Sequence, residues 1–210
     1  MRTPAFPGAG DRRPPRNSWP TGVAWAVLEI RSESRADVAA VRAVHLAAFA
    51  TPAEADLVDA IRAGPYALPR FSVVAVREGR VVGHALMSHA QLVHHEVERP
   101  VLVLAPLAVL PDERHRGTGT ALMHECIGRA DHAGEPLLLL VGHLGYYPRF
   151  GFVLAGRYGV RPPAPLSDAV LLARRLSGYR PAWRGQLRYP AFFEGVMADM
   201  ERPPAPQLTI

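Results

Sequence analysis

Residues 107–122 are the part of this 210-residue chain whose types and spacing are best suited to chemistry. An apolar run is joined there to a predicted helix by a loop with Arg114, Arg116, Gly117 and Gly119. Backbone N–H groups at a helix N-terminus have no helical acceptor and carry the positive end of the dipole, so they can bind phosphate. Glycine allows close approach of the backbone, and arginine adds charge. The loop therefore predicts an anion site that holds a pyrophosphate.

Three kinds of nucleotide loop compete for this pattern. The chain contains no lysine, which excludes the Gly-Lys-Ser/Thr of a P-loop NTPase. A dinucleotide fingerprint expects a third glycine in the first βα unit, but here the sequence continues from Gly119 to Leu122. The pattern Arg114-x-x-Gly117-x-Gly119, directly after an apolar strand, closely resembles the acetyl-CoA loop of the GNAT acetyltransferase superfamily.

Hydrophobic periodicity predicts the elements that come before this loop. Ser34 precedes a helical stripe of Val38, Val41, Leu46 and Phe49. The further predicted elements are a strand over 25–31, a helix capped by Thr51-Pro52 and stopped by Gly64-Pro65, a hairpin of 71–77 and 80–92 around Glu78-Gly79, a second turn around 94–100, and a strand over 101–109.

Pro106 lies inside the last of these strands, where a proline cannot donate to a neighbouring strand. It therefore belongs at an edge or at a bulge where pairing opens. In the GNAT family the corresponding strand splays from its neighbour, and the pantetheine arm bonds to the exposed backbone. The resemblance implies that Leu107, Ala108 and Val109 supply that edge.

A βαβ unit is predicted around the loop. The helix after it presents Leu122, Met123, Cys126, Ile127 and Ala130 on one face and ends near Gly134. The wholly apolar run 137–141 is typical of a strand parallel to the preceding one and covered on both faces. Cys126, the only cysteine, is therefore expected to be an inert core residue.

The segment Gly145-Tyr-Tyr-Pro-Arg-Phe-Gly-Phe152 resembles the second GNAT signature, and a last strand is predicted over 169–176. The resemblance covers about residues 27–176 and implies that Tyr147 lies beside the CoA sulfur, where its hydroxyl could donate to the departing thiolate. Packing beneath the sheet is the alternative role of Tyr147.

The fold expected from the resemblance is an α/β GNAT fold: a mixed, mostly antiparallel sheet with a splayed central strand pair and helices on both faces. We expect a disordered Pro/Gly/Arg-rich tail over 1–22, the acetyltransferase domain over 25–176, an aromatic extension packed on it over 177–200, and a flexible tail over 201–210. The implied acetyl-CoA site comprises Leu107, Ala108, Val109, Arg114, His115, Arg116, Gly117, Thr118, Gly119 and Thr120.

Composition restricts the partners. The 24 basic residues against 19 acidic ones give a net charge of +5, but they are scattered, so no nucleic-acid arm is predicted. No signal peptide and no run approaching ~18 apolar residues is present, so we expect a cytoplasmic protein without a membrane partner. The sequence leaves both a monomer and a homodimer possible. His84, His89, His94 and His95 lack diagnostic metal-ligand spacing, so no metal is expected.

The expected function is acetyl-CoA-dependent N-acetyl transfer, direct to a primary amine of a small molecule or peptide. The alternative is a non-catalytic acyl-CoA-binding or regulatory module on the same fold. The sequence assigns no general base. Four residues lie on elements that in this fold can border the acceptor site, and each is expected at the surface: Glu96, Glu98, His84 and His89.

Overall fold

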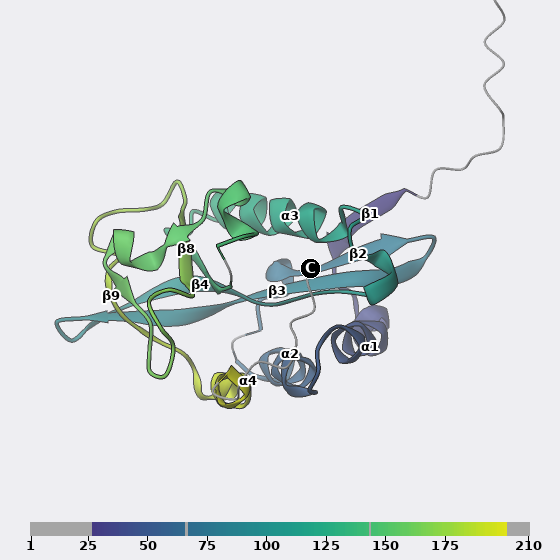
Figure 1. Cartoon of the computed structure of the whole chain (residues 1–210), viewed down its shortest axis with the longest axis horizontal. Coiled ribbons are helices and arrows are strands. Elements are labelled where there is room, and N and C mark those ends of the chain that lie inside the picture. Colours follow the sequence, from purple (N-terminus) through teal and green to yellow (C-terminus); the bar gives the residue numbers. More distant parts are fainter. Residues whose placement is uncertain (1–26, 66, 143, 201–210) are drawn as a thin grey trace, which may run out of the picture.

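The computed structural model describes residues 27–65, 67–142 and 144–200, with side chains described as far as Met197. Within them, nine strands form one sheet in the order β1-β2-β3-β4-β5-β8-β6, and β9 joins β3 and β7 (Figure 1). The strands are β1 Leu28–Ser32, β2 Ser72–Arg77, β3 Arg80–His94, β4 Val97–Val109, β5 Leu137–Val141, β6 Val153–Leu154, β7 Val160–Arg161, β8 Leu171–Arg175 and β9 Gly185–Arg188. The helices are α1 Val38–Ala48, α2 Ala53–Ala63, α3 Thr118–His132 and α4 Glu194–Met200.

Helices cover both faces of the sheet, which confirms the predicted fold class. Figure 1 shows α3 above the sheet and α1, α2 and α4 below it. Most strand pairs are antiparallel. The strands β4 and β5, which precede and follow α3 in the sequence, are parallel neighbours in the sheet. None of the helices that the structure describes is long and apolar enough to cross a membrane.

The apolar face of α3 is the predicted one. Leu122, Met123, Cys126 and Ala130 are fully buried against the sheet. Burial raises the pKa of the Cys126 thiol to about 12, because the thiolate would lose its hydration there. Cys126 is therefore a packing residue, as expected.

Two details of the predicted elements were wrong. The second turn comprises only His95 and Glu96, with φ of 47° and 63°, so β4 begins at Val97 and not near residue 101. Two residues in the left-handed region close a hairpin whose twist matches its strands. On α1, Leu46 is 47% exposed, whereas His45 is buried; a polar cluster, described below, places this histidine on the core face.

The strand β4 changes partners along its length. It pairs with β3 from Val97 to Val109, but only Leu102 and Val103 are in register with β5. The register with β3 shifts around Pro106, and the Ala105–Pro106 peptide bond is cis. From Leu104 onward β4 therefore has no partner on its β5 side, and the predicted splay is present.

The chain after β8 returns to the sheet. β9 pairs antiparallel with β3 at residues 91–93, and α4 packs against α2 (Figure 1). Tyr179 and Trp183 pack against the core, and Phe193 is buried. The expected tails 1–22 and 201–210, and the first residues of the predicted strand 25–31, lie outside the described residues.

A chain of hydrogen-bonded polar side chains is buried between α1 and the sheet. The Ser72 hydroxyl donates to Glu33, so it accepts from His84 Nε2 at 2.9 Å. His84 Nδ1 then accepts from His45 Nε2 at 2.8 Å. Arg62 donates to the other Glu33 oxygen at 2.7 Å. These bonds assign the neutral Nε2–H tautomer to His84. His45 donates through Nε2, and its Nδ1 has no partner among the described residues. Both rings are fully buried.

Burial keeps these histidines neutral in the folded protein. Burial is the main cause that lowers the pKa of His84. The pKa of His45 is lowered to about 3, mainly by burial and further by the neighbouring His84 and Arg62. Unfolded histidine has a pKa near 6.5. The stability that they contribute is therefore complete above pH 6.5 and is lost as the pH falls below it.

We predict that the free energy of unfolding falls on acidification from pH 7.5 to 5.5, by about 1.4 kcal/mol for His45, and that His84 adds a loss in the same direction. Burial alone would raise the pKa of Glu33, but hydrogen bonds from His84 and Ser72 lower it to about 2. Glu33 therefore does not titrate in this pH window. His45→Gln keeps a donor toward His84 and should remove the His45 part of the pH dependence, about 1.4 kcal/mol, in urea denaturation.

The control is His132→Gln at the exposed end of α3. An unchanged pH slope in His45→Gln would contradict the assignment of a neutral buried ring.

Candidate active site

The glycine loop leads into α3 through a left-handed residue. Gly117 is the N-cap of the helix, with φ of 82°, a conformation that favours glycine. The first helical bond is donated by the Ala121 N–H to the Gly117 carbonyl at 2.9 Å. The N–H groups of Thr118, Gly119 and Thr120 thus have no helical acceptor and can bind an anion.

A hollow of about 640 Å³ and one of about 430 Å³ are present in the described part of the chain, and the smaller one lies at this loop. Six of the ten predicted cofactor residues line it: Val109, Arg114, His115, Gly117, Gly119 and Thr120. Leu107, Ala108, Arg116 and Thr118 do not. The other lining residues, which the sequence did not single out for the cofactor, are Glu113, Tyr146 and Arg149.

The arginines of the loop are held by different partners. Arg114 donates to the Ala48 carbonyl at the end of α1 over 3.2 Å, which fixes a cation at a helix C-terminus. Arg116 is half exposed and donates to Glu113 at 2.8 Å. The Glu113 carboxylate also accepts from Arg77 at 3.0 Å. Because two arginines neutralise Glu113, it does not make the hollow repel an anion.

Arg149 brings a further cation to this hollow from the second motif. Its Nε donates to the Tyr146 carbonyl at 2.9 Å, and its guanidinium lies over the Tyr146 ring at 4.7 Å. The sequence could have indicated that Tyr146 and Arg149 lie at this hollow, since both residues belong to the Tyr-Tyr-Pro-Arg segment. The resemblance drew attention to Tyr147 alone.

The side chain of Thr118 is buried against the sheet. Its side chain is 1% exposed, and its methyl group lies 3.2 Å from the position that a Cβ on Gly83 would take. No described protein group bonds to its hydroxyl. The Thr118 side chain therefore packs the start of α3 onto β3, whereas its backbone N–H stays available for an anion.

The predicted pantetheine edge adjoins the loop. Ala108 and Val109 are buried, Leu107 is partly exposed, and all three pair with β3 on one side only. The backbone on the side toward β5 can accept a partner strand or an extended ligand, because strands pair through exactly such groups.

Tyr147 lies at the end of the strand that splays from β4. Its ring packs on Gly142, where a Cβ would come within 2.2 Å of the ring. Counting on from the Val103–Leu139 pair places Gly142 at the level of Pro106. Burial raises the pKa of Tyr147 to about 12, with a smaller contribution from Tyr146, so its phenol keeps its proton at neutral pH.

Of the four candidate bases, only His84 faces the side of the sheet that α1 covers, and it is buried rather than at the surface as expected. His89 contacts Glu135 at 2.9 Å just after α3. Glu96 and Glu98 are exposed at the distal hairpin, where Glu98 pairs with Arg188. Within the described ranges no three potential metal ligands gather.

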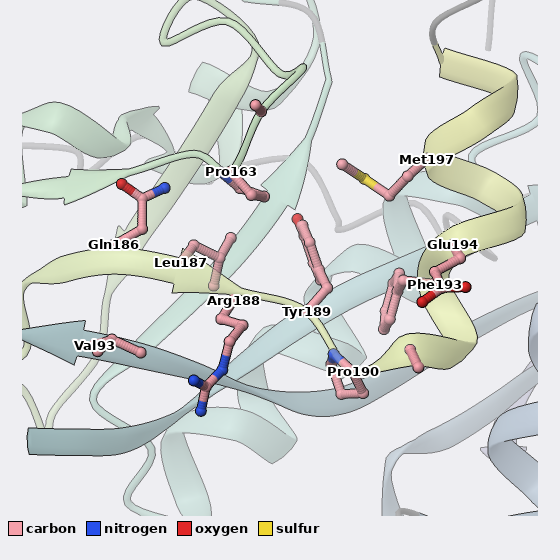
Figure 2. Close-up of a pocket in the computed structure, with 12 residues that line it drawn as sticks. Val93, Pro163, Gln186, Leu187, Arg188, Tyr189, Pro190, Phe193, Glu194 and Met197 are labelled. Carbon is pink, nitrogen blue, oxygen red and sulfur yellow. The ribbon is translucent and has the colours of Figure 1, made fainter. Parts of the chain in front are cut away.

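The larger cavity lies on the other face, at the C-terminal extension. It is lined by β9, by the residues that lead into α4, and by Pro163 and Ala164 (Figure 2). Tyr189 points its hydroxyl into the space between Pro163 and Met197. The aromatic composition of this segment was the only sequence signal for it.

Comparison with known proteins agrees with this geometry. Residues 29–155 match the model of a family described as "Acetyltransferase (GNAT) domain". The uncharacterized N-acetyltransferase YjhQ of Escherichia coli K12 is 35% identical over 136 residues, which are 64% of this chain and 75% of that protein. The uncharacterized N-acetyltransferase YhbS of the same strain is 30% identical over 150 residues, covering 70% and 87% of the two chains.

Solved structures give the same result. The complex of E. coli YhbS with CoA superposes with a TM-score of 0.72 at 27% identity, covering 80% of this chain and 92% of that one. A GNAT family acetyltransferase of Brucella melitensis in complex with acetyl-CoA gives 0.65 at 29% identity, covering 80% and 99%. By family model, relatives and fold together, this chain belongs to the GNAT acetyltransferase family.

Proposed function

We propose that this protein transfers the acetyl group of acetyl-CoA directly to a primary amine. The observation that carries the proposal is the unpaired β5 side of β4, which runs from Leu104 to Val109 into a loop with three free N–H groups. A pyrophosphate at the loop and an extended arm along β4 would bring a thioester to the level of Gly142. The CoA and acetyl-CoA complexes of its structural relatives support this use of the site.

Direct transfer requires few groups from the protein. A neutral amine attacks the thioester carbon, the C–N bond forms, the C–S bond breaks, and the sulfur takes a proton. Tyr147 is the proposed donor, since its hydroxyl is protonated and makes no bond to a described protein group. The attacking nitrogen loses one proton to solvent, and the Tyr147 phenolate takes one proton back from solvent, so atoms and charge balance.

The decisive experiment is release of free CoA from acetyl-CoA with a panel of amines. A non-catalytic acyl-CoA-binding module would bind acetyl-CoA and release no CoA above the rate without amine. Release that depends on one amine, together with its acetylated product, would exclude that alternative.

We predict that acetyl-CoA raises Tm, because a ligand at 100 times its Kd stabilises the folded state by about 2.7 kcal/mol. Gly119→Val should abolish the shift, since its side chain would occupy the place of the phosphate. Gly128→Val is the matched control on the same helix, where a Cβ meets nothing within 4 Å. An equal shift in both variants would place the cofactor elsewhere.

We predict that Tyr147→Phe lowers kcat roughly ten- to a hundredfold with acetyl-CoA affinity nearly unchanged, because general-acid assistance is typically worth ~10²–10⁴ and a thiolate needs less of it. Tyr158→Phe, in a tyrosine that contacts Tyr179 and lies outside both hollows, is the control. A wild-type rate in Tyr147→Phe, with chemistry limiting, would make Tyr147 a packing residue.

A further inference from the structure

The turn of the second motif forms one wall of the hollow at the glycine loop. Tyr146 and Arg149 line this hollow from the 3-10 helix Tyr147–Phe150 and the residue before it. The turn is fixed against α3, because the centre of the buried Phe150 ring lies 5.4 Å from that of the His124 ring. The hollow therefore has two walls: the glycine loop with the start of α3, and this turn.

We propose that the guanidinium of Arg149 holds the 3′-phosphate on the ribose of CoA, apart from the pyrophosphate that the N–H groups at the start of α3 bind. The inference rests on the cofactor site of the proposed function and not on the transfer step. It makes Arg149 the residue by which the protein distinguishes CoA from its 3′-dephospho form.

The charges of the hollow leave two cations for an anionic ligand. Among the charged lining residues, Glu113 is neutralised by two arginines. Arg114 and Arg149 bond to backbone carbonyls and have no carboxylate partner within the described residues. A carbonyl carries no formal charge, so it does not compensate either guanidinium. CoA has two separate phosphate sites, a pyrophosphate and a phosphate monoester that carries about −1.5 to −2 charges at neutral pH.

The two arginines lie on different sides of the hollow. The bond to the Ala48 carbonyl holds Arg114 toward α1, below the sheet (Figure 1). Arg149 belongs to the turn that packs beside α3, above the sheet. A pantetheine arm along β4 ends at Val109, so the pyrophosphate belongs at the loop and the ribose lies beyond it. The exposed Arg149 is then the cation that the ribose phosphate reaches.

The side chain of Arg149 is already ordered for a phosphate. Its Nε donates to the Tyr146 carbonyl at 2.9 Å and one Nη to the Gly145 carbonyl at 3.4 Å, whereas the other Nη has no partner among the described residues. The Tyr146 ring beneath the guanidinium is itself in contact with the rings of Tyr147 and Phe150. A planar fork of donors suits phosphate oxygens, and an ordered side chain loses less entropy on binding.

The test compares the dissociation constants of CoA and 3′-dephospho-CoA by titration calorimetry. The wild type should bind CoA about tenfold more tightly, the lower end for a charge-assisted hydrogen bond because the group is exposed. Arg149→Gln should weaken CoA about tenfold and 3′-dephospho-CoA less than about twofold. Arg157→Gln removes the same charge from an exposed arginine of the 3-10 helix Ala155–Tyr158, outside both hollows, and should keep the wild-type ratio.

Arg116→Gln tests the rival arginine of the loop, which is half exposed and paired with Glu113. It should weaken both ligands by the same factor, so their ratio stays. Equal affinity of the wild type for both ligands, equal weakening of both by Arg149→Gln, or loss of the ratio in Arg116→Gln instead would overturn the inference. A wild type that binds neither ligand would overturn the cofactor site as well. The expected ratio without CoA release from acetyl-CoA in the amine panel would overturn the proposed transfer alone.

Discussion

The rest of this structure depends on how β4 divides its hydrogen bonds. The strand keeps β3 as a partner over its whole length but keeps β5 only at Leu102 and Val103. Unpaired backbone groups at the centre of a sheet are costly unless solvent or a ligand satisfies them. Here the gap opens beside the N-terminus of α3, where further N–H groups are unpaired. Both sets of groups suit one long ligand with a phosphate end and an amide arm.

The surrounding residues maintain this arrangement by ordinary packing. Gly83 lets Thr118 and Leu122 approach β3 closely, so the start of α3 lies directly on the sheet. Gly142 does the same for the Tyr147 ring at the end of β5. Arg114 ties the loop to the last turn of α1, and two arginines neutralise the buried carboxylate of Glu113. The cofactor hollow is thus built largely from contacts that exist without ligand.

Much of this could be predicted from the sequence where a signal is local. The loop, the apolar face of α3, the strand β5 and the break at Pro106 each follow from residue types and spacing. Hydrogen bonds between residues far apart in the sequence have no such signal. Nothing near His45 in the sequence indicates that it is buried, because the residues of its polar cluster, His84 and Glu33, come from other elements. Likewise β9 is only four residues long, too short for a period to be recognised in the sequence, and its pairing with β3 and β7 makes it a strand. The burial of the Thr118 side chain has no local signal either, because it packs beside Gly83, thirty-five residues earlier in the chain.

The position of β9 has a consequence for the solubility of the protein. The strand β2 pairs with β3 only as far as Leu86, and β9 pairs with the same edge further on, at residues 91–93. Without β9 that stretch would be an open edge, which invites pairing between molecules and aggregation. Removal of the C-terminal extension would therefore expose this edge, because the segment that lines the larger cavity also covers the sheet. Exchange of single side chains on an intact extension leaves this edge paired.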